Sequence, residues 1–370
     1  MNLGRNYKLK VYIATFTQYE NYGSRLQNFA LCYILKKIGA KPISLLVTSK
    51  KEYIKNYIKS LLLKFPLITA NQLKWYNEKK KQKVFNNLKK ELNLLKISYH
   101  ELCLLNFNDA KAIVGSDQVW SPAHLKNNPC DINLFFLRFI SKDKRIAYAP
   151  SLGIDNIPED MTTIYKNYIA DFKNLSVREF SGQELIKNLT NLDVAIMPDP
   201  VFLLTREEWA NITNTDNACI MMKEKYILVY FLSEQSPETW SDILKYAEKN
   251  SLKLIVITGN KYNKDSLIVP PDMFVKLFNN ADKVFTDSFH GAAFSIMFKV
   301  PFIVFYRSDV KQFSRIETLL NKYSFNAVYK NSYDFDTIFD NEEFDISELI
   351  IRKERAEGIK YLKKAVLNGE

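Results

Sequence analysis

Residues 283–294 read KVFTDSFHGAAF, a sequence that indicates a short buried strand, a sharp polar turn and the first turn of a helix. In this arrangement Ser288 lies near the N-cap, and His290 lies inside the first helical turn. Free backbone N–H groups and the positive end of the helix dipole converge there, so the turn can bind an anion. A histidine at this place could bind a phosphoryl or carboxyl group or move a proton on it. The alternative is a serine cap and a packed histidine without chemistry.

Short apolar strands alternate with amphipathic helices on both sides of this stretch, which predicts α/β units with parallel sheets. The strands of the first unit are expected at residues 8–16, 42–47, 111–114, 145–149, 175–177 and 194–197. Those of the second unit are expected at residues 226–231, 252–258, 283–286 and 302–305. Two such sheets imply a cleft at the carboxyl ends of their strands, where ligands usually bind.

The sequence Pro198-Asp199-Pro200 and the polar residues 211–217 mark the predicted boundary between the two units. We therefore expect an N-terminal domain over residues 1–205, with a basic helical insertion at about residues 50–100. A C-terminal domain is expected over residues 206–335. Residues 336–370 are expected to hold an acidic stretch and a helix.

The composition is that of a soluble globular protein, with 47% hydrophobic and 25% charged residues. No secretory signal is visible, because the polar and basic N-terminus is followed by too short an apolar run. No apolar run approaches the roughly 20 residues that span a bilayer. The four cysteines lack CxxC spacing, so neither a disulfide framework nor a zinc site is predicted. We therefore expect a cytoplasmic protein without a metal or cofactor.

Nearly all of the net charge of +11 comes from one segment. Between Lys50 and Lys96 there are 13 lysines and three glutamates, a net charge of +10, with apolar residues interleaved. A pair of basic amphipathic helices could lie on the anionic inner face of the plasma membrane and approach a lipid-linked substrate. The alternative is a solvated lysine face on helices whose other face is core. Nucleic acid is not favoured as a partner, because no nucleic-acid-binding motif accompanies the charge.

Four further segments place polar residues where predicted strands end. They are NYGSRLQ at residues 21–27, GSDQVW at residues 115–120, SVRE at residues 176–179 and PDP at residues 198–200. Each segment alone has an ordinary explanation. Asn21, Asp117 and Asp199 could form Asx-turns or helix caps. Arg178 and Glu179 could form a surface ion pair.

Together and in this order, these segments and the SFHG sequence at residues 288–291 resemble the polysaccharide pyruvyl transferase family. The resemblance covers roughly residues 8–306, without the lysine-rich insertion. It implies a GT-B-like fold, in which two Rossmann-type domains with parallel sheets face a central cleft. The N-terminal domain would then be on the acceptor side and the C-terminal domain on the donor side. It also implies transfer of pyruvate from the co-substrate phosphoenolpyruvate, as a ketal, to two hydroxyls of one sugar. That sugar would belong to a cell-surface glycan or its lipid-linked precursor.

The resemblance also suggests roles for the site residues. His290 is the candidate acid/base, Asp117 is the candidate base for a sugar hydroxyl, and Arg178 is the candidate ligand of the donor's carboxylate or phosphate. The other donor-binding candidates are Ser288, Phe289, Gly291, Lys283 and Arg307. The acceptor-binding candidates are Asn21, Gly23, Ser24, Gln27, Ser116, Gln118 and Asp199. Many members carry an arginine at the place of Ser288, so we expect Lys283, Arg307 or Arg178 to supply that phosphate contact.

Two other functions remain open on this pattern. A GT-B glycosyltransferase that uses a sugar nucleotide shares the architecture and the basic surface, and a non-catalytic glycan-assembly protein could keep the fold. Asp334-Phe335-Asp336 has the spacing of a metal-binding pair, but it lies in an acidic tract, and we interpret it as solvated charge. No GxSxG sequence supports a Ser-His-Asp hydrolase.

Overall fold

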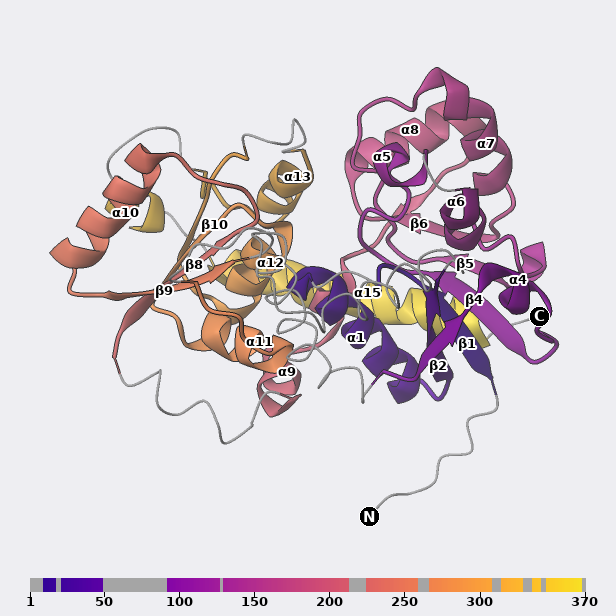
Figure 1. Ribbon diagram of the computed structural model, residues 1–370, viewed down its shortest axis with the longest axis horizontal. Coiled ribbons are helices and arrows are strands. Elements are labelled where there is room, and N and C mark those ends of the chain that lie inside the picture. Colours follow the sequence, from indigo (N-terminus) through magenta and orange to yellow (C-terminus); the bar gives the residue numbers. More distant parts are fainter. Residues whose placement is uncertain are drawn as a thin grey trace, which may run out of the picture.

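The computed structural model describes residues 9–17, 21–48, 92–126, 129–212, 224–258, 266–307, 314–328, 335–340 and 344–367. Two β-sheets, one of seven and one of four strands, lie side by side with helices packed around each (Figure 1). Every pairing between the described strands is parallel. The α/β, GT-B-like fold is thus as the sequence predicts. Residues 50–91 of the predicted basic helical insertion lie outside the described residues, and Leu94–Ile97 within it form a strand instead of a helix.

The seven-stranded sheet forms the N-terminal half, in the strand order β3-β2-β1-β4-β5-β6-β7. Its strands are β1 (Lys10–Ala14), β2 (Lys41–Val47), β3 (Leu94–Ile97), β4 (Ala110–Val114), β5 (Arg145–Ala147), β6 (Asn174–Val177) and β7 (Ala195–Ile196). In β1, Val11 and Ile13 belong to one core cluster, and Tyr12 and Ala14 belong to another. Because alternate side chains of a strand point to opposite faces, a strand covered on both faces reads as a continuous apolar run.

Helices cover both faces of this sheet. They are α1 (Tyr22–Lys37), α4 (Tyr99–Cys103), α5 (Pro122–Leu125), α6 (Pro129–Phe135), α7 (Glu159–Ile169) and α8 (Phe180–Thr190), with a short 3₁₀ helix, η1 (Lys142–Lys144). The 3₁₀ helix η2 (Pro200–Leu203) and α9 (Arg206–Ile212) then lead out of the sheet. Strand β3 was not predicted: it follows the basic segment and pairs with β2 at the edge of the sheet.

The four-stranded sheet forms the C-terminal half, in the order β11-β10-β8-β9. Its strands are β8 (Tyr226–Phe231), β9 (Lys253–Thr258), β10 (Lys283–Thr286) and β11 (Phe302–Val304). The helices of this half are α10 (Pro237–Lys249), α11 (Pro271–Asn280), α12 (Phe289–Phe298), α13 (Ser314–Lys322) and α14 (Phe335–Asp340). All six side chains of β8 are buried, which places this strand at the centre of the half.

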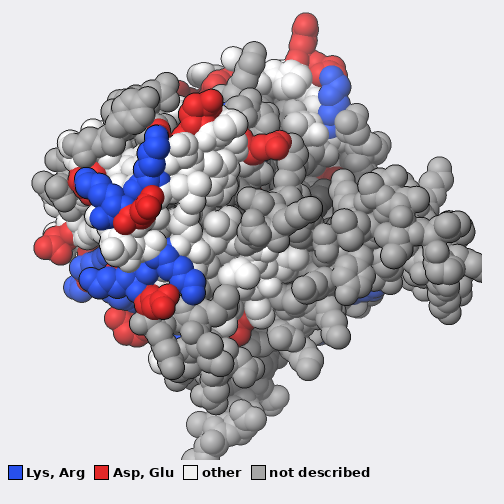
Figure 2. Space-filling model, turned by 60° about the vertical axis from the view of Figure 1, so that its left-hand side comes forward, with Lys and Arg blue, Asp and Glu red and all other residues white. Residues whose placement is uncertain are grey.

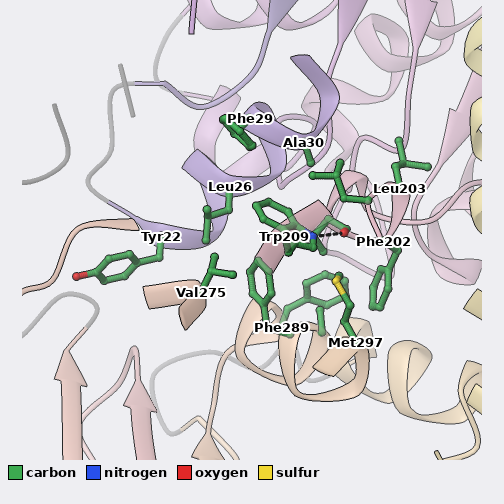
Figure 3. Close-up of a cluster of buried hydrophobic side chains, with 14 of the residues drawn as sticks. Tyr22, Leu26, Phe29, Ala30, Phe202, Leu203, Trp209, Val275, Phe289 and Met297 are labelled. Atoms are coloured by element: carbon green, nitrogen blue, oxygen red, sulfur yellow. Dashed lines mark hydrogen bonds between the residues drawn. The ribbon is translucent and has the colours of Figure 1, made fainter. Parts of the chain in front are cut away.

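One apolar cluster joins the two halves (Figure 3). The ring of Tyr22 on α1 stacks on Phe274 of α11, with 4.3 Å between the centroids. The Tyr22 hydroxyl donates a hydrogen bond to the carbonyl oxygen of Val269 (2.8 Å). Nearby, the indole N–H of Trp209 donates to the carbonyl oxygen of Val201 (3.0 Å), as the dashed line in Figure 3 marks. These contacts fix the start of α1 against the C-terminal half.

The last helix, α15 (Phe344–Leu367), crosses from the C-terminal half to the N-terminal half (Figure 1). Near its start, Glu348 pairs with Lys299 at the end of α12 (2.5 Å). Near its end, the carbonyl oxygen of Ala365 accepts a hydrogen bond from the ammonium group of Lys111 in β4 (2.7 Å). One helix therefore contacts both halves.

Acidic and basic side chains alternate on the face seen in Figure 2 instead of forming a patch of one sign. Ion pairs of the C-terminal half follow the same pattern, with Lys249 beside Asp336 (3.2 Å) and Lys253 beside Glu224 (3.7 Å). Of the Asp334-Phe335-Asp336 stretch, Asp334 lies outside the described residues, and Asp336 is held by Lys249 and by the hydroxyl of Tyr246 (2.6 Å). Among the described residues, no helix has the length and apolar character that crossing a bilayer requires.

Candidate active site between the two halves

His290 lies in the first turn of α12, as the sequence predicts. Ser288 is the N-cap, and its hydroxyl accepts a hydrogen bond from the backbone N–H of Gly291 (3.4 Å). Thr286 supports the turn, because its hydroxyl accepts from the N–H of Ser288 (3.1 Å) and donates to the carbonyl oxygen of Tyr230 (2.7 Å). Buried hydroxyls therefore hold the imidazole at a fixed helix end.

Helix α1 brings Gly23 against the imidazole ring of His290. Asn21 is the N-cap of α1, and its side-chain oxygen accepts a hydrogen bond from the N–H of Ser24 (3.2 Å). A Cβ atom on Gly23 would overlap the ring of His290 at Nδ1. A residue without a side chain at position 23 therefore lets the first turns of α1 and α12, which come from different halves, approach each other closely.

Asp199 lies between His290 and Arg178. Its Oδ2 atom accepts hydrogen bonds from Nη1 of Arg178 and from the hydroxyl of Ser116, both at 2.8 Å. The same oxygen lies 3.5 Å from Nε2 of His290. Burial opposes the charge of Asp199, but the neighbouring His290 and Arg178 outweigh it and hold the pKa of this carboxyl well below its usual range. Asp199 is therefore an anion that orients both side chains.

The separation of 3.5 Å between His290 and Asp199 is longer than an ordinary hydrogen bond. Nε2 of His290 has no hydrogen-bond partner within the described part of the chain, although this side chain is buried. The contact with Asp199 is therefore mainly electrostatic. The imidazole keeps one nitrogen able to exchange a proton with a bound ligand.

Asp117 follows β4 and faces the same place from the N-terminal half. It has a backbone φ of 75°, a left-handed conformation that is uncommon for residues other than glycine. Its carboxylate accepts hydrogen bonds from the hydroxyl of Ser24 (2.5 Å) and from the N–H of Gln118 (2.9 Å). Burial raises the pKa of Asp117, but His290, Arg178 and the Ser24 hydroxyl together lower it below its usual value. Asp117 is thus ionised and able to accept a proton.

Arg178 is buried beside a small cavity between the halves. Its guanidinium lies over the ring of Phe289, with 4.3 Å from Cζ to the centroid. Nη1 is bound by Asp199, but Nε and Nη2 find no hydrogen-bond partner among the residues described. An unsatisfied buried donor costs on the order of 1–3 kcal/mol, and more for a charged group. Nε faces the carboxylate of Glu179 at 3.8 Å, so the Nη2 side of the guanidinium is the one suited to an anionic ligand.

Glu179 is a site residue that the sequence did not single out. Its Oε1 atom accepts three hydrogen bonds, from the hydroxyl of Ser151 (2.9 Å) and from the N–H groups of Leu152 (2.8 Å) and Gly153 (3.2 Å). Its Oε2 atom lies 3.8 Å from Nε of Arg178. The side chains of both residues are about 97–98% buried, so the alternative of a surface ion pair is wrong.

Asp287, in the turn before α12, is another residue that the sequence did not single out. Its carboxylate accepts hydrogen bonds from the N–H groups of Leu232 (2.6 Å) and Ser233 (2.8 Å). Burial raises the pKa of Asp287, and these hydrogen bonds oppose the rise only in part. Asp287 therefore ties the loop after β8 to the turn that carries His290.

Of the predicted candidates, Lys283 lies away from this place, and Gln27 and Gly291 are held in packed positions. Lys283 starts β10, at the opposite end of the strand from the His290 turn, and its ammonium group lies 3.9 Å from the ring centroid of Phe339. Gln27 is fully buried and donates a hydrogen bond to the hydroxyl of Thr15 (2.7 Å). A Cβ atom on Gly291 would overlap the hydroxyl of Thr286, which indicates a packing role.

The residues that do meet come from both halves of the molecule. Among the described residues, no group of three or more His, Cys, Asp or Glu side chains could hold a metal ion. The structure brings together the imidazole of His290, the guanidinium of Arg178 and the carboxylates of Asp117, Asp199 and Glu179. A cavity of about 20 Å³ lies beside Arg178, Asp199 and Glu179. Such a set can bind an anion and move protons on it without a metal ligand set.

Comparisons with known proteins gave one family match. The sequence model of the family described as Polysaccharide pyruvyl transferase matches residues 21–309. No curated protein matches the chain. Among solved structures, a UDP-GlcNAc 2-epimerase of Methanocaldococcus jannaschii is 14% identical, with 94% of this chain and 93% of that chain covered and a TM-score of 0.45. The glycosyltransferase SnogD from Streptomyces nogalater is 8% identical, with 98% and 100% covered and a TM-score of 0.49.

Proposed function

This chain belongs to the polysaccharide pyruvyl transferase family, and we propose that it uses phosphoenolpyruvate as the donor. In this proposal the pyruvyl group is transferred, as a ketal, to two hydroxyls of one sugar in a cell-surface glycan or its lipid-linked precursor. Phosphoenolpyruvate carries a carboxylate and a phosphate, so its site needs cationic donors beside a group that can move a proton.

One observation carries the proposal. Asp199 holds His290 and Arg178 at the same carboxylate oxygen, 3.5 Å from the imidazole and 2.8 Å from the guanidinium. In the proposal, a donor bound to Arg178 therefore lies beside the carboxylate that also contacts the imidazole. This juxtaposition suits a reaction in which the donor must be held by its charge while a proton moves on it.

Ketal formation can then be written in four steps. The enol carbon C3 gains a proton and becomes a methyl group, which leaves an oxocarbenium-like centre at C2. A sugar hydroxyl forms the first C2–O bond and loses its proton. The bond from C2 to the phosphate oxygen breaks, and phosphate leaves with a proton. The second hydroxyl attacks C2, loses its proton and closes the ring.

In this scheme His290 moves the proton to the enol carbon or to the departing phosphate. Asp199 orients the imidazole and stabilises its charged form. Asp117 accepts a proton from a sugar hydroxyl, since its carboxylate is ionised and faces the same place. Asn21 and Gln118 contact the acceptor. The membrane contact through residues 50–96 would serve a lipid-linked acceptor.

The proposal is tested by incubating the protein with phosphoenolpyruvate and candidate glycans and measuring both products. We expect inorganic phosphate and a pyruvylated sugar in equal amounts, the latter identified by the methyl signal of the ketal in the proton NMR spectrum. A parallel panel of sugar nucleotides tests the glycosyltransferase alternative. Transfer of a sugar from that panel, without phosphate release from phosphoenolpyruvate, would overturn the proposal.

A further inference from the structure

Helix α13 places Arg315 at the cavity that Arg178 lines from the other half. This helix begins after the end of the family match at residue 309. Nε of Arg315 is buried and has no hydrogen-bond partner in the part of the chain that the structure describes. The cavity thus has an unsatisfied guanidinium N–H group on each side.

The charges around the cavity do not neutralise Arg315. Burial is the main cause that lowers the pKa of Arg315, to about 10, and the like charge of Arg178 lowers it further. Asp117 and Glu179 oppose this effect only in part. Lys322, the other cation that lines the cavity, already pairs with Glu354 of α15.

Two guanidinium groups, each with a buried and unsatisfied N–H group, form a site for an oxyanion. A phosphate with two negative charges would satisfy N–H groups of both arginines and remove the repulsion between them. The cavity of about 20 Å³ has room for roughly one water molecule. Entry of a phosphate therefore requires α13 to move away from Arg178, and binding would hold the two sides together.

We propose that Arg315 is a second donor-binding residue, which binds the phosphate of phosphoenolpyruvate together with Arg178. This inference rests on the proposed function. Many family members make a phosphate contact through an arginine at the place of Ser288, and from the sequence we expected Lys283, Arg307 or Arg178 to replace it. The inference assigns this contact to Arg315. Of the three expected residues, only Arg178 lines the cavity, and Lys283 lies at the far end of β10.

The test measures the binding of inorganic phosphate, pyruvate and phosphoenolpyruvate to Arg315→Met by titration calorimetry. Loss of one charge-assisted contact should weaken binding of the two phosphate ligands by roughly 10- to 100-fold. Arg315→Lys, which keeps the charge, should recover part of this loss. Arg352→Met is the matched control, since this arginine lies on α15 with its side chain 67% exposed, and it should bind all three ligands like the wild type.

The melting temperature of the ligand-free protein separates a binding role from a structural one. Because Arg315 is repelled by Arg178 and has an unsatisfied N–H group, Arg315→Met should melt at the wild-type temperature or above. A lower melting temperature with unchanged phosphate affinity would show that Arg315 is structural and overturn the inference. If the Met variant fails to fold, Arg315→Gln takes its place under the same criteria.

The outcomes also separate this inference from the proposed function. If the wild type binds phosphoenolpyruvate and Arg315→Met binds it equally well, the inference is wrong, while the proposed donor stands. If the wild type binds inorganic phosphate but no phosphoenolpyruvate, and Arg315→Met loses the phosphate, the anion site stands without the proposed donor. If the wild type binds neither ligand, both proposals fail.

Discussion

The imidazole of His290 occupies the space that a side chain at Gly23 would need. This contact joins the first turns of two helices from different halves of the molecule. The absence of a single methyl group on the opposite helix thus sets the position of the imidazole, for which we propose the proton-moving role. Substitutions at position 23 therefore act on His290 without touching its chemistry.

We predict that Gly23→Ala displaces His290, lowers transferase activity by at least about 100-fold and lowers the melting temperature. The control is a double variant, Gly23→Ala with His290→Ala, in which the overlap is gone. Its melting temperature should equal that of His290→Ala alone, because the two changes act through one contact. If the loss of stability in the double variant equalled the sum of the losses in the two single variants, the overlap could not be assigned to the imidazole.

His290→Ala should lower the rate of ketal formation by about 10²- to 10⁴-fold, the usual contribution of a positioned acid or base. Binding of phosphoenolpyruvate should change little, because the main proposed donor contacts lie on Arg178 and Arg315. Arg178→Ala should show the reverse pattern, with donor affinity lost. Near-wild-type ketal formation by His290→Ala would remove this residue from the mechanism.

Acid should destabilise the fold through Asp199. The pKa of this carboxyl is lowered in the folded protein, because His290 and Arg178 outweigh the effect of burial. Its contribution to stability is therefore complete above the unfolded-state pKa of about 3.9 and is lost as the pH falls toward the folded-state value. Urea unfolding measured from pH 7 down to about pH 3 should show this loss.

Asp199→Asn checks the source of that pH dependence. It should cost about 3–5 kcal/mol at pH 7, since it leaves Arg178 buried without its main carboxylate partner. It should also flatten the dependence of stability on pH below about pH 4. A variant that keeps the full wild-type dependence would show that other carboxyl groups are responsible.

Tyr22→Phe should loosen the contact between the halves. The hydroxyl of Tyr22 donates to the carbonyl oxygen of Val269 (2.8 Å) and accepts from its N–H (3.1 Å). Removal of this hydroxyl leaves both buried backbone groups unsatisfied, at a cost of roughly 1–3 kcal/mol. Urea unfolding measures this cost. Phe274→Leu, which removes the stacking partner but no hydrogen bond, shows how much comes from the ring alone.

The turn before α12 could be predicted because its signals are local. A buried strand, a polar turn, a serine at the N-cap and a helical apolar pattern all lie within residues 283–294. The site residues on short motifs that follow strands could be found for the same reason, since parallel strands bring their carboxyl ends to one edge. Asp117, Arg178 and Asp199 belong to this group.

Arg315 and Glu179 were missed because their importance depends on burial, which no short motif records. Glu179 looks like an ordinary charged neighbour of Arg178 until three donors on residues 151–153 surround it. Arg315 lies on α13, a helix that the sequence did not predict, and it is near Arg178 only through the docking of the two halves. For Lys283, closeness in sequence was misleading, because a strand four residues long separates it from the turn.

The position of helix α15 affects how the protein folds during its synthesis on the ribosome. Its last turns bury Leu362, Ala365 and Val366 in the same cluster as Val11 of the first strand. The N-terminal half therefore cannot complete its core until residues 344–367 have left the exit tunnel, although nearly all of its own residues emerge first. A fragment ending at residue 205 would keep this apolar surface open to water and should aggregate.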